Sequence, residues 1–405
     1  QIAQQLVTDH NLIISFQAPE DENVVLPTEA EAIEMLAAVK NEAIEAPVEE
    51  EIRTTLVEDA PKAGKIRKTA YNEILGTTEW TLSNGVRVIV KPTEFKQDEI
   101  LFYATSLGGY SQVKTEDLPS ALLATDVVEL AGLADMNVTD LQKALTGKRV
   151  SLSPSIGGNS ESLSGSSTVK DLETLLQLNY LYFTAPRRDE ESYQTLMSIL
   201  ESQLANRDKN PKVAFNDSIQ MMTSNNSERT VIFTKELLEK VSLDKALEVY
   251  KARFANPADF TFFFVGNVSP EDSTFKAQVC QWLGGLKANK KKEKVVDHQV
   301  RVPLGKQQNY FTQKMETKTA SNRIQYTSYD MPYTLANDLN MEMIGRILST
   351  RYLESIRERE GGSYGVGCAA WMTIRPVPSA VLIMQFDTDP EKQSKLMDII
   401  HEEVM

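Results

Sequence analysis

Several segments of the chain alternate hydrophobic and polar residues with a period of two, the pattern of a half-buried strand. The clearest lies between Glu79 and Pro92, where Asn84 and Gly85 separate two alternating stretches and predict a tight hairpin. The same criterion predicts further strands at residues 11–16, 100–106, 150–156, 259–265, 308–317, 322–329, 364–370 and 380–387.

Other segments repeat their apolar positions every three to four residues and predict helices. Thr28 and Glu31 have capping-box spacing and open a helix that Pro47 ends, while Asp389 opens the last helix, which runs to the end of the sequence. Ser269 stands before Pro270 and opens another. The remaining helices are expected at residues 118–133, 138–145, 169–183, 190–206, 243–254 and 334–348.

The order of these elements predicts the fold class. Strands and helices mix irregularly and a hairpin joins two strands, which favours an α+β protein with largely antiparallel sheets over a doubly wound parallel one. The elements after residue 306 repeat the order in which the preceding unit begins, so we expect repeated domains.

We divide the chain into four parts. Residues 1–70 are expected to be the last strand and helix of a preceding domain plus a linker, and residues 71–290 a complete domain. Residues 291–305 are predicted to be a lysine-rich linker, and residues 306–405 a truncated second domain. Both ends of the sequence are expected to be boundaries within a longer polypeptide.

Charge excludes several functional classes. The net charge is −14, but residues 1–60 hold fourteen Asp and Glu against Lys40 and Arg53, so the remainder is close to neutral. Neither a nucleic-acid footprint nor a basic membrane-binding face is indicated. The lysine-dense run 287–294 lacks interleaved aromatic residues, which favours a solvated linker over a binding patch, and no apolar run approaches the length of a membrane span.

The reactive residues exclude further classes. Cys280 and Cys368 have neither metal nor redox spacing and are expected to be small buried residues, not a disulfide. The only histidines are His10, His298 and His401, none within helical reach of another, so no paired-histidine zinc motif can be built. The glycines at 361–367 do not have the spacing of a phosphate-binding loop.

Arg357 and Tyr364 are the candidate functional residues. They flank Gly361 and Gly362, which provide the positive φ angles that the end of a helix prefers. A guanidinium and a phenol held at such a corner can donate hydrogen bonds to a peptide backbone and to an oxygen that gains negative charge. The plainer alternative is that Arg357 pairs with Glu354 or Glu360 and that Tyr364 only packs.

Four segments together resemble the pitrilysin/insulinase family of zinc metallopeptidases, and the resemblance covers about residues 1–405. They are the hairpin at 79–92, Phe-Phe-Phe-Val-Gly-Asn at 262–267, Trp-Leu-Gly-Gly-Leu at 282–286, and the corner from Arg357 to Tyr364. The resemblance implies a processing-peptidase-like (LuxS-type) α+β fold, in which an N-terminal half carries zinc and a C-terminal half closes over the peptide. It also implies kinship with the mitochondrial processing peptidase subunits.

The resemblance makes this chain the C-terminal half. Helix 119–133 stands where active members carry the inverted zinc motif, but it contains no histidine, and Asp126 and Glu129 have no partners to complete a ligand set. This helix is therefore expected to serve core packing. The family's arginine and tyrosine match Arg357, which would bind a substrate carbonyl, and Tyr364, which would donate to the tetrahedral oxyanion.

The expected function is thus a metal-free half of a zinc metallopeptidase, inactive alone, whose zinc lies in the N-terminal half. Its expected partners are that half, or a homologous catalytic subunit, and a peptide substrate; the family suggests the periplasm. An alternative is a non-catalytic partner subunit or peptide-binding scaffold of a processing-peptidase-like complex. A generic peptide-binding module, independent of Arg357 and Tyr364, is a third possibility.

Overall fold

The computed structural model describes residues 12–18, 24–42, 53, 55–207, 209–289, 292–315, 317–361, 363 and 365–405. They fall into two compact units, Gln1–Ile52 and Arg53–Met405, which are described separately.

The first unit contains the predicted capped helix, α2 (Glu29–Asn41), which ends at Asn41 instead of at the predicted Pro47. The Thr28 hydroxyl accepts from the backbone N–H of Glu31 at 3.3 Å, and the Glu31 carboxylate accepts from the N–H of Thr28 at 2.7 Å. The predicted strand at 11–16 is wrong for residues 12–16, which adopt no regular structure; Asn11 and Pro47 lie outside the described residues. A strand is stable only beside another strand, and the described residues of this unit contain none.

The second unit begins with a seven-stranded sheet, in the order β1-β2-β3-β7-β4-β6-β5. All neighbouring pairs are antiparallel except β3 and β7, so the predicted α+β class with a largely antiparallel sheet is confirmed. The strands are β1 (Ile66–Asn72), β2 (Thr77–Leu82), β3 (Arg87–Pro92), β4 (Ile100–Leu107), β5 (Val150–Ile156), β6 (Ser160–Ser167) and β7 (Thr261–Gly266).

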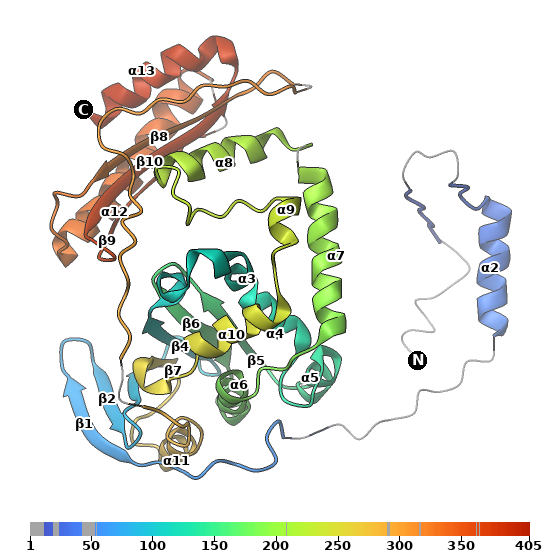
Figure 1. Cartoon of the computed structure of the whole chain (residues 1–405), viewed down its shortest axis with the longest axis vertical. Coiled ribbons are helices and arrows are strands. Elements are labelled where there is room, and N and C mark those ends of the chain that lie inside the picture. The colour runs from blue at the N-terminus through green and yellow to red at the C-terminus, as the bar shows by residue number, and fades with distance from the viewer. Residues whose placement is uncertain are drawn as a thin grey trace. The chain divides into compact units, whose positions relative to one another are not determined.

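The described residues between Leu118 and Trp282 also form nine helices (Figure 1). The predicted helix at 118–133 is broken at Leu123 into two pieces, and the helix expected from Ser269 begins only at Ser273, because Asp272 caps it. They are α3 (Leu118–Leu122), α4 (Ala124–Ala131), α5 (Val138–Ala144), α6 (Leu172–Thr184), α7 (Glu190–Arg207), α8 (Pro211–Thr223), α9 (Lys235–Leu238), α10 (Leu243–Arg253) and α11 (Ser273–Trp282).

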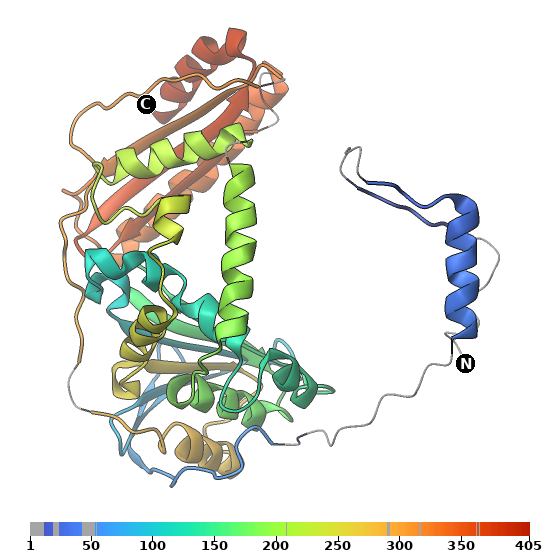
Figure 2. The ribbon, with the colours of Figure 1, turned by 45° about the vertical axis from the view of Figure 1, so that its right-hand side comes forward.

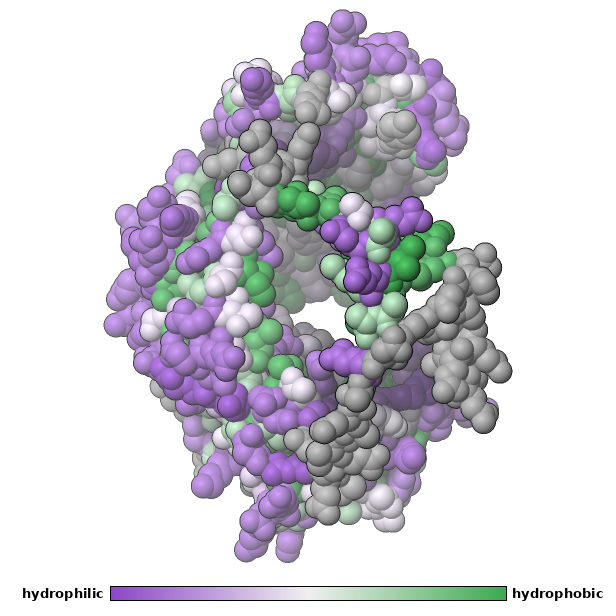
Figure 3. All heavy atoms as spheres, turned by 90° about the vertical axis from the view of Figure 1, so that its right-hand side faces the viewer, coloured by the Kyte–Doolittle hydropathy of each residue, from purple (hydrophilic) through white to green (hydrophobic). Residues whose placement is uncertain are grey.

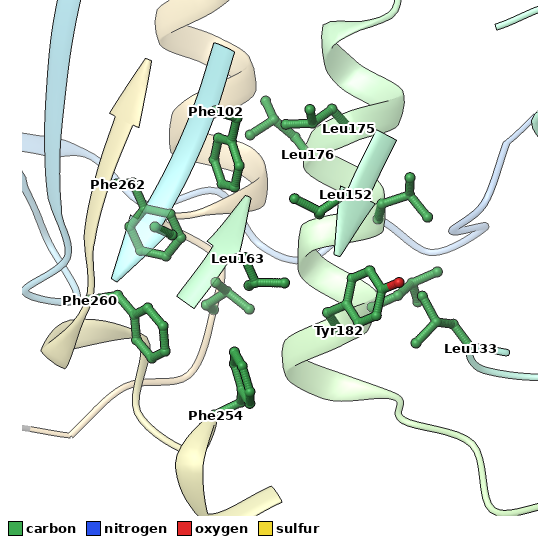
Figure 4. Packing of buried hydrophobic residues seen from close by; sticks show 14 of the residues in the cluster. Phe102, Leu133, Leu152, Leu163, Leu175, Leu176, Tyr182, Phe254, Phe260 and Phe262 are labelled. Atoms are coloured by element: carbon green, nitrogen blue, oxygen red, sulfur yellow. The ribbon is translucent and has the colours of Figure 1, made fainter. Parts of the chain in front are cut away.

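The core lies on one face of the seven-stranded sheet. Figure 4 shows Phe102, Leu163 and Phe262 from the strands directed toward Leu176 and Tyr182 of α6. Fully burying such a side chain stabilises the fold by roughly 1.5–3 kcal/mol. The opposite face leaves alternate strand residues accessible, because successive side chains of a strand point to opposite sides.

A three-stranded sheet follows, in the order β8-β10-β9 (Figures 1 and 2). It consists of β8 (Ala320–Ser328), β9 (Gly367–Thr373) and β10 (Ser379–Thr388). Helices α12 (Leu335–Tyr352) and α13 (Gln393–Val404) share a small core with β9 and β10. The strand order repeats β4-β6-β5 of the larger sheet, which agrees with the predicted repeat.

Two strand predictions in this part are corrected. Residues 308–315 form no strand, because their alternating pattern has no strand beside it, and β9 begins at Gly367 instead of residue 364. No described helix is long and apolar enough to cross a membrane. Cys280 and Cys368 are free thiols, as predicted, but half-buried rather than buried.

Candidate functional site

Arg357 projects from a helical turn whose other side is fixed in the small core. Beyond Tyr352 the helix continues as a π-helical turn, Leu353–Glu358, in which Ser355 and Ile356 are buried. The hydroxyl of buried Tyr352 donates to the carbonyl of Ile400 at 3.2 Å and joins the end of α12, just before this turn, to α13. The exposed Arg357 side chain therefore rises from a firmly packed base. Single π-helical turns are frequent at functional sites.

The turn ends where the two glycines predicted it. Gly361 has φ +52°, and its N–H donates to the carbonyl of Arg357 at 3.2 Å. Lys392 donates to the carbonyl of Gly361 at 3.3 Å, and Lys395 forms an ion pair with Glu360. Gly362 and Tyr364 lie outside the described residues, so the pairing of Arg357 with Tyr364 stays a prediction.

The plainer alternative was that Arg357 pairs with Glu354 or Glu360. Glu360 pairs with Lys395, and among the described residues no ion pair joins Arg357 to Glu354 or Glu360. The guanidinium is thus accessible to a ligand carbonyl or carboxylate. Nothing in its described surroundings assigns it a purely structural role.

The helix that stands in place of the zinc motif serves the core. Val127 and Val128 of α4 are buried, which confirms the packing role predicted for it. Burial raises the pKa of Asp126, and burial together with the nearby Asp126 raises the pKa of Glu129, although a hydrogen bond with Ser153 opposes the second shift. Burial also raises the pKa of Tyr110, to about 12.

These carboxyl groups are not accompanied by further metal ligands in the part of the chain that the structure describes, where no three His, Cys, Asp or Glu side chains gather. His298 is hydrogen-bonded to the carbonyl of Ser111 at 2.8 Å, and Nδ1 of His401 to the hydroxyl of Tyr326 at 2.9 Å. His10 lies outside the described residues.

The open face of the larger sheet carries a cavity of about 830 Å³ beneath the β1–β2 hairpin. Its apolar lining includes Tyr71, Ile89 and Phe263, and the ring of Phe263 lies 6.2 Å from that of Tyr103, centroid to centroid. The sequence did not predict this cavity, because the linker expected to end at residue 70 includes most of Ile66–Asn72, which form strand β1. By contrast, the end of the unit near α13 is mainly hydrophilic (Figure 3).

Comparison with known proteins defines the class. Residues 240–405 match the family model described as the Peptidase M16 inactive domain. The chain is similar to a zinc protease PQQL-like protein of Arabidopsis thaliana, with 26% identity over 88% of this chain and 36% of that protein. It is also similar to the probable zinc protease PqqL of Escherichia coli K12, with 24% identity over 80% of this chain and 34% of that protein.

A solved structure shows the same fold. The periplasmic protease PqqL of Escherichia coli superposes with a TM-score of 0.74 at 20% identity, covering 93% of this chain and 41% of that one. Residues 240–405 thus carry the inactive type of M16 peptidase domain, which agrees with the predicted relationship to the pitrilysin/insulinase peptidases. It spans about a third of the length of the curated relatives it matches.

Proposed function

We propose that this chain is the non-catalytic part of a zinc metallopeptidase that hydrolyses peptide bonds. Zinc and its ligands would belong to a catalytic N-terminal half, either of the same polypeptide or of a homologous subunit. This chain would bind no metal and would supply part of the wall of the substrate chamber. The periplasm is the proposed location, since the similar Escherichia coli protein is a periplasmic protease.

Arg357 is the observation that carries this proposal. An exposed guanidinium on a packed π-helical turn has donors that can grip a peptide carbonyl, and its fixed base limits the entropy lost on binding. Tyr364, seven residues later, would donate a hydrogen bond to the oxyanion that develops at the peptide carbonyl, while zinc held by the catalytic half would supply Lewis-acid chemistry there.

The open sheet face supports the assignment of a peptide as ligand. Ile89, Phe263 and Tyr71 line a cavity large enough for several side chains, and Tyr103 extends the apolar surface beside it. An extended peptide lying on this face would place hydrophobic side chains in this cavity.

The test uses the full-length natural protein containing this chain. Arg357→Ala and Tyr364→Phe should each leave the zinc content unchanged and lower peptide hydrolysis by about 10²-fold. Arg359→Ala, an exposed arginine two residues from Arg357, is the matched control and should hydrolyse peptide normally. Unchanged hydrolysis in both Arg357 and Tyr364 variants would refute these roles and favour a non-catalytic scaffold.

A further inference from the structure

The segment between the two sheets is attached to the first sheet by a buried ion pair. We name residues 292–302 the connector. Glu293 of the connector pairs with Arg253 at the end of α10, with one oxygen at 2.5 Å from Nη1 and the other at 3.4 Å from Nη2. The Arg253 side chain is only 7% exposed. A charge so deeply buried needs a partner, because an isolated one would be strongly unfavourable.

A second carboxylate completes this cluster. Glu161 of β6 is 1% exposed and accepts the N–H of Gly109 at 2.7 Å. Burial raises the pKa of Glu161, while the Gly109 hydrogen bond and the charge of Arg253 oppose that rise. A Cβ added to Gly108 would lie within 3.3 Å of polar atoms of Arg253, Glu293 and Glu161, so the three side chains converge on this glycine.

Further contacts continue along the connector. The N–H of Val296 donates to the Ser111 hydroxyl at 3.0 Å, and His298 is hydrogen-bonded to the carbonyl of the same serine. Gln112 donates to the carbonyl of Lys294. The backbone of the predicted solvated linker is therefore bound to residues 111–112, while the side chains of Lys292 and Lys294 are exposed.

The far end of the connector contacts the second sheet. The N–H of Val302 donates a hydrogen bond to the hydroxyl of Tyr329, just after β8, at 2.9 Å. The guanidinium of Arg301 lies 6.0 Å from the centre of the same ring and pairs with Asp297 at 2.6 Å. The connector thus has ordered contacts at both ends.

The second sheet also has direct contacts with the first part of the unit, since Lys212 of α8 pairs with Asp387 of β10 and Asn159 donates to the carbonyl of Arg375 at 3.2 Å. We propose that the pair Arg253–Glu293, with Ser111, clamps the connector and, together with these contacts, holds the second sheet, with Arg357, in one orientation relative to the first. Arg253 and Glu293 are positioning residues, since they act through the connector. Any effect on catalysis rests on the proposed function, whereas the clamp itself does not. A displacement of a substrate-binding group by about 1 Å can cost up to 10²-fold in rate.

The clamp is tested with spin labels on this chain. Lys170→Cys and Glu402→Cys, both exposed, carry the labels, in a background where Cys280 and Cys368 are replaced by serine. Pulsed electron paramagnetic resonance should give a narrow distance distribution in this background and a clearly broadened one after Glu293→Ala. Glu293 is the residue to change, because its loss leaves the buried Arg253 beside the carboxylate of Glu161 and so retains the core. A thermal melt of the variant checks that it remains folded.

Lys294→Ala is the matched control, since it removes a charge from the connector without removing a clamp contact, and it should keep the narrow distribution. Equal widths in Glu293→Ala and Lys294→Ala overturn the clamp. In the full-length protein, Glu293→Ala should lower kcat about tenfold with zinc content unchanged, and Glu293→Gln should lower it less.

The two proposals fail differently. If the full-length protein hydrolyses no peptide even without a substitution, the proposed function is refuted. If Glu293→Ala still broadens the distance distribution in that case, the clamp stands. Loss of hydrolysis without broadening would refute the clamp alone.

Discussion

Shortening Ile356 tests whether the base of the candidate site is packed as described. Ile356 is 0% exposed in the small core of the second sheet, one residue before Arg357. Alanine removes three carbon atoms, worth about 2.4 kcal/mol in transfer from water, and leaves a cavity that adds to this cost. We therefore expect Ile356→Ala to destabilise this region by about 3 kcal/mol and Ile356→Val by about 1 kcal/mol.

Hydrogen exchange measured by mass spectrometry localises the effect. A loss of about 3 kcal/mol should speed exchange in α12, β9 and β10 by roughly 150-fold where exchange follows unfolding of the second sheet, with β4 and β7 unchanged. Leu353→Ala, on the same turn but 40% exposed, is the matched control and should cost less than about 1 kcal/mol. An acceleration below about tenfold in Ile356→Ala, or one shared by β4, would contradict the described packing.

Three further substitutions test other features. Glu129→Gln removes a carboxyl whose pKa is raised in the folded state, so the wild type loses stability as the pH rises through that pKa. The melting temperature of the variant, relative to that of the wild type, should therefore increase from pH 4 to pH 8. A difference in melting temperature that does not depend on pH would contradict the raised pKa. Gly361→Ala meets no atom within 4 Å but keeps a φ of +52°, so it should cost about 1 kcal/mol in urea unfolding, and no cost would show that the backbone relaxes there. Gly165→Ala would place a Cβ 1.9 Å from the carbonyl oxygen of Ser151 and should lower the melting temperature by several degrees, whereas Gly158→Ala, with no atom within 4 Å, should be nearly neutral.

The sequence correctly predicted those elements whose conformation is determined by a few neighbouring residues. The Asn84-Gly85 hairpin and the Thr28 cap are confirmed because a turn and a cap depend on a few neighbouring residues. Strand β6 was missed because five of its eight residues are serine, which carries no strand pattern; the partner strands β4 and β5 determine its conformation.

The candidate site was predictable in part. Gly361 marks the end of the turn that carries Arg357, as its sequence indicated. The docking of the connector could not be predicted, because it depends on Arg253 and Ser111, which are distant in sequence from Glu293 and become its neighbours only in the folded chain. The lysine content of the connector correctly predicted that its lysine side chains are exposed, but it did not predict that the backbone of the connector is bound to residues 111–112.

The place of β7 in the larger sheet determines when that sheet can form. Strand β7 lies between β3 and β4, yet residues 261–266 follow their partners at 87–92 only after strands β4 to β6 and helices α3 to α10. During synthesis, β1–β3 and β4–β6 emerge as separate groups whose inner edges have no neighbour until β7 leaves the ribosome. Such long-range pairing slows folding and leaves strand edges open to association with other chains. The nascent chain should therefore depend on chaperones most strongly before residue 266 has emerged.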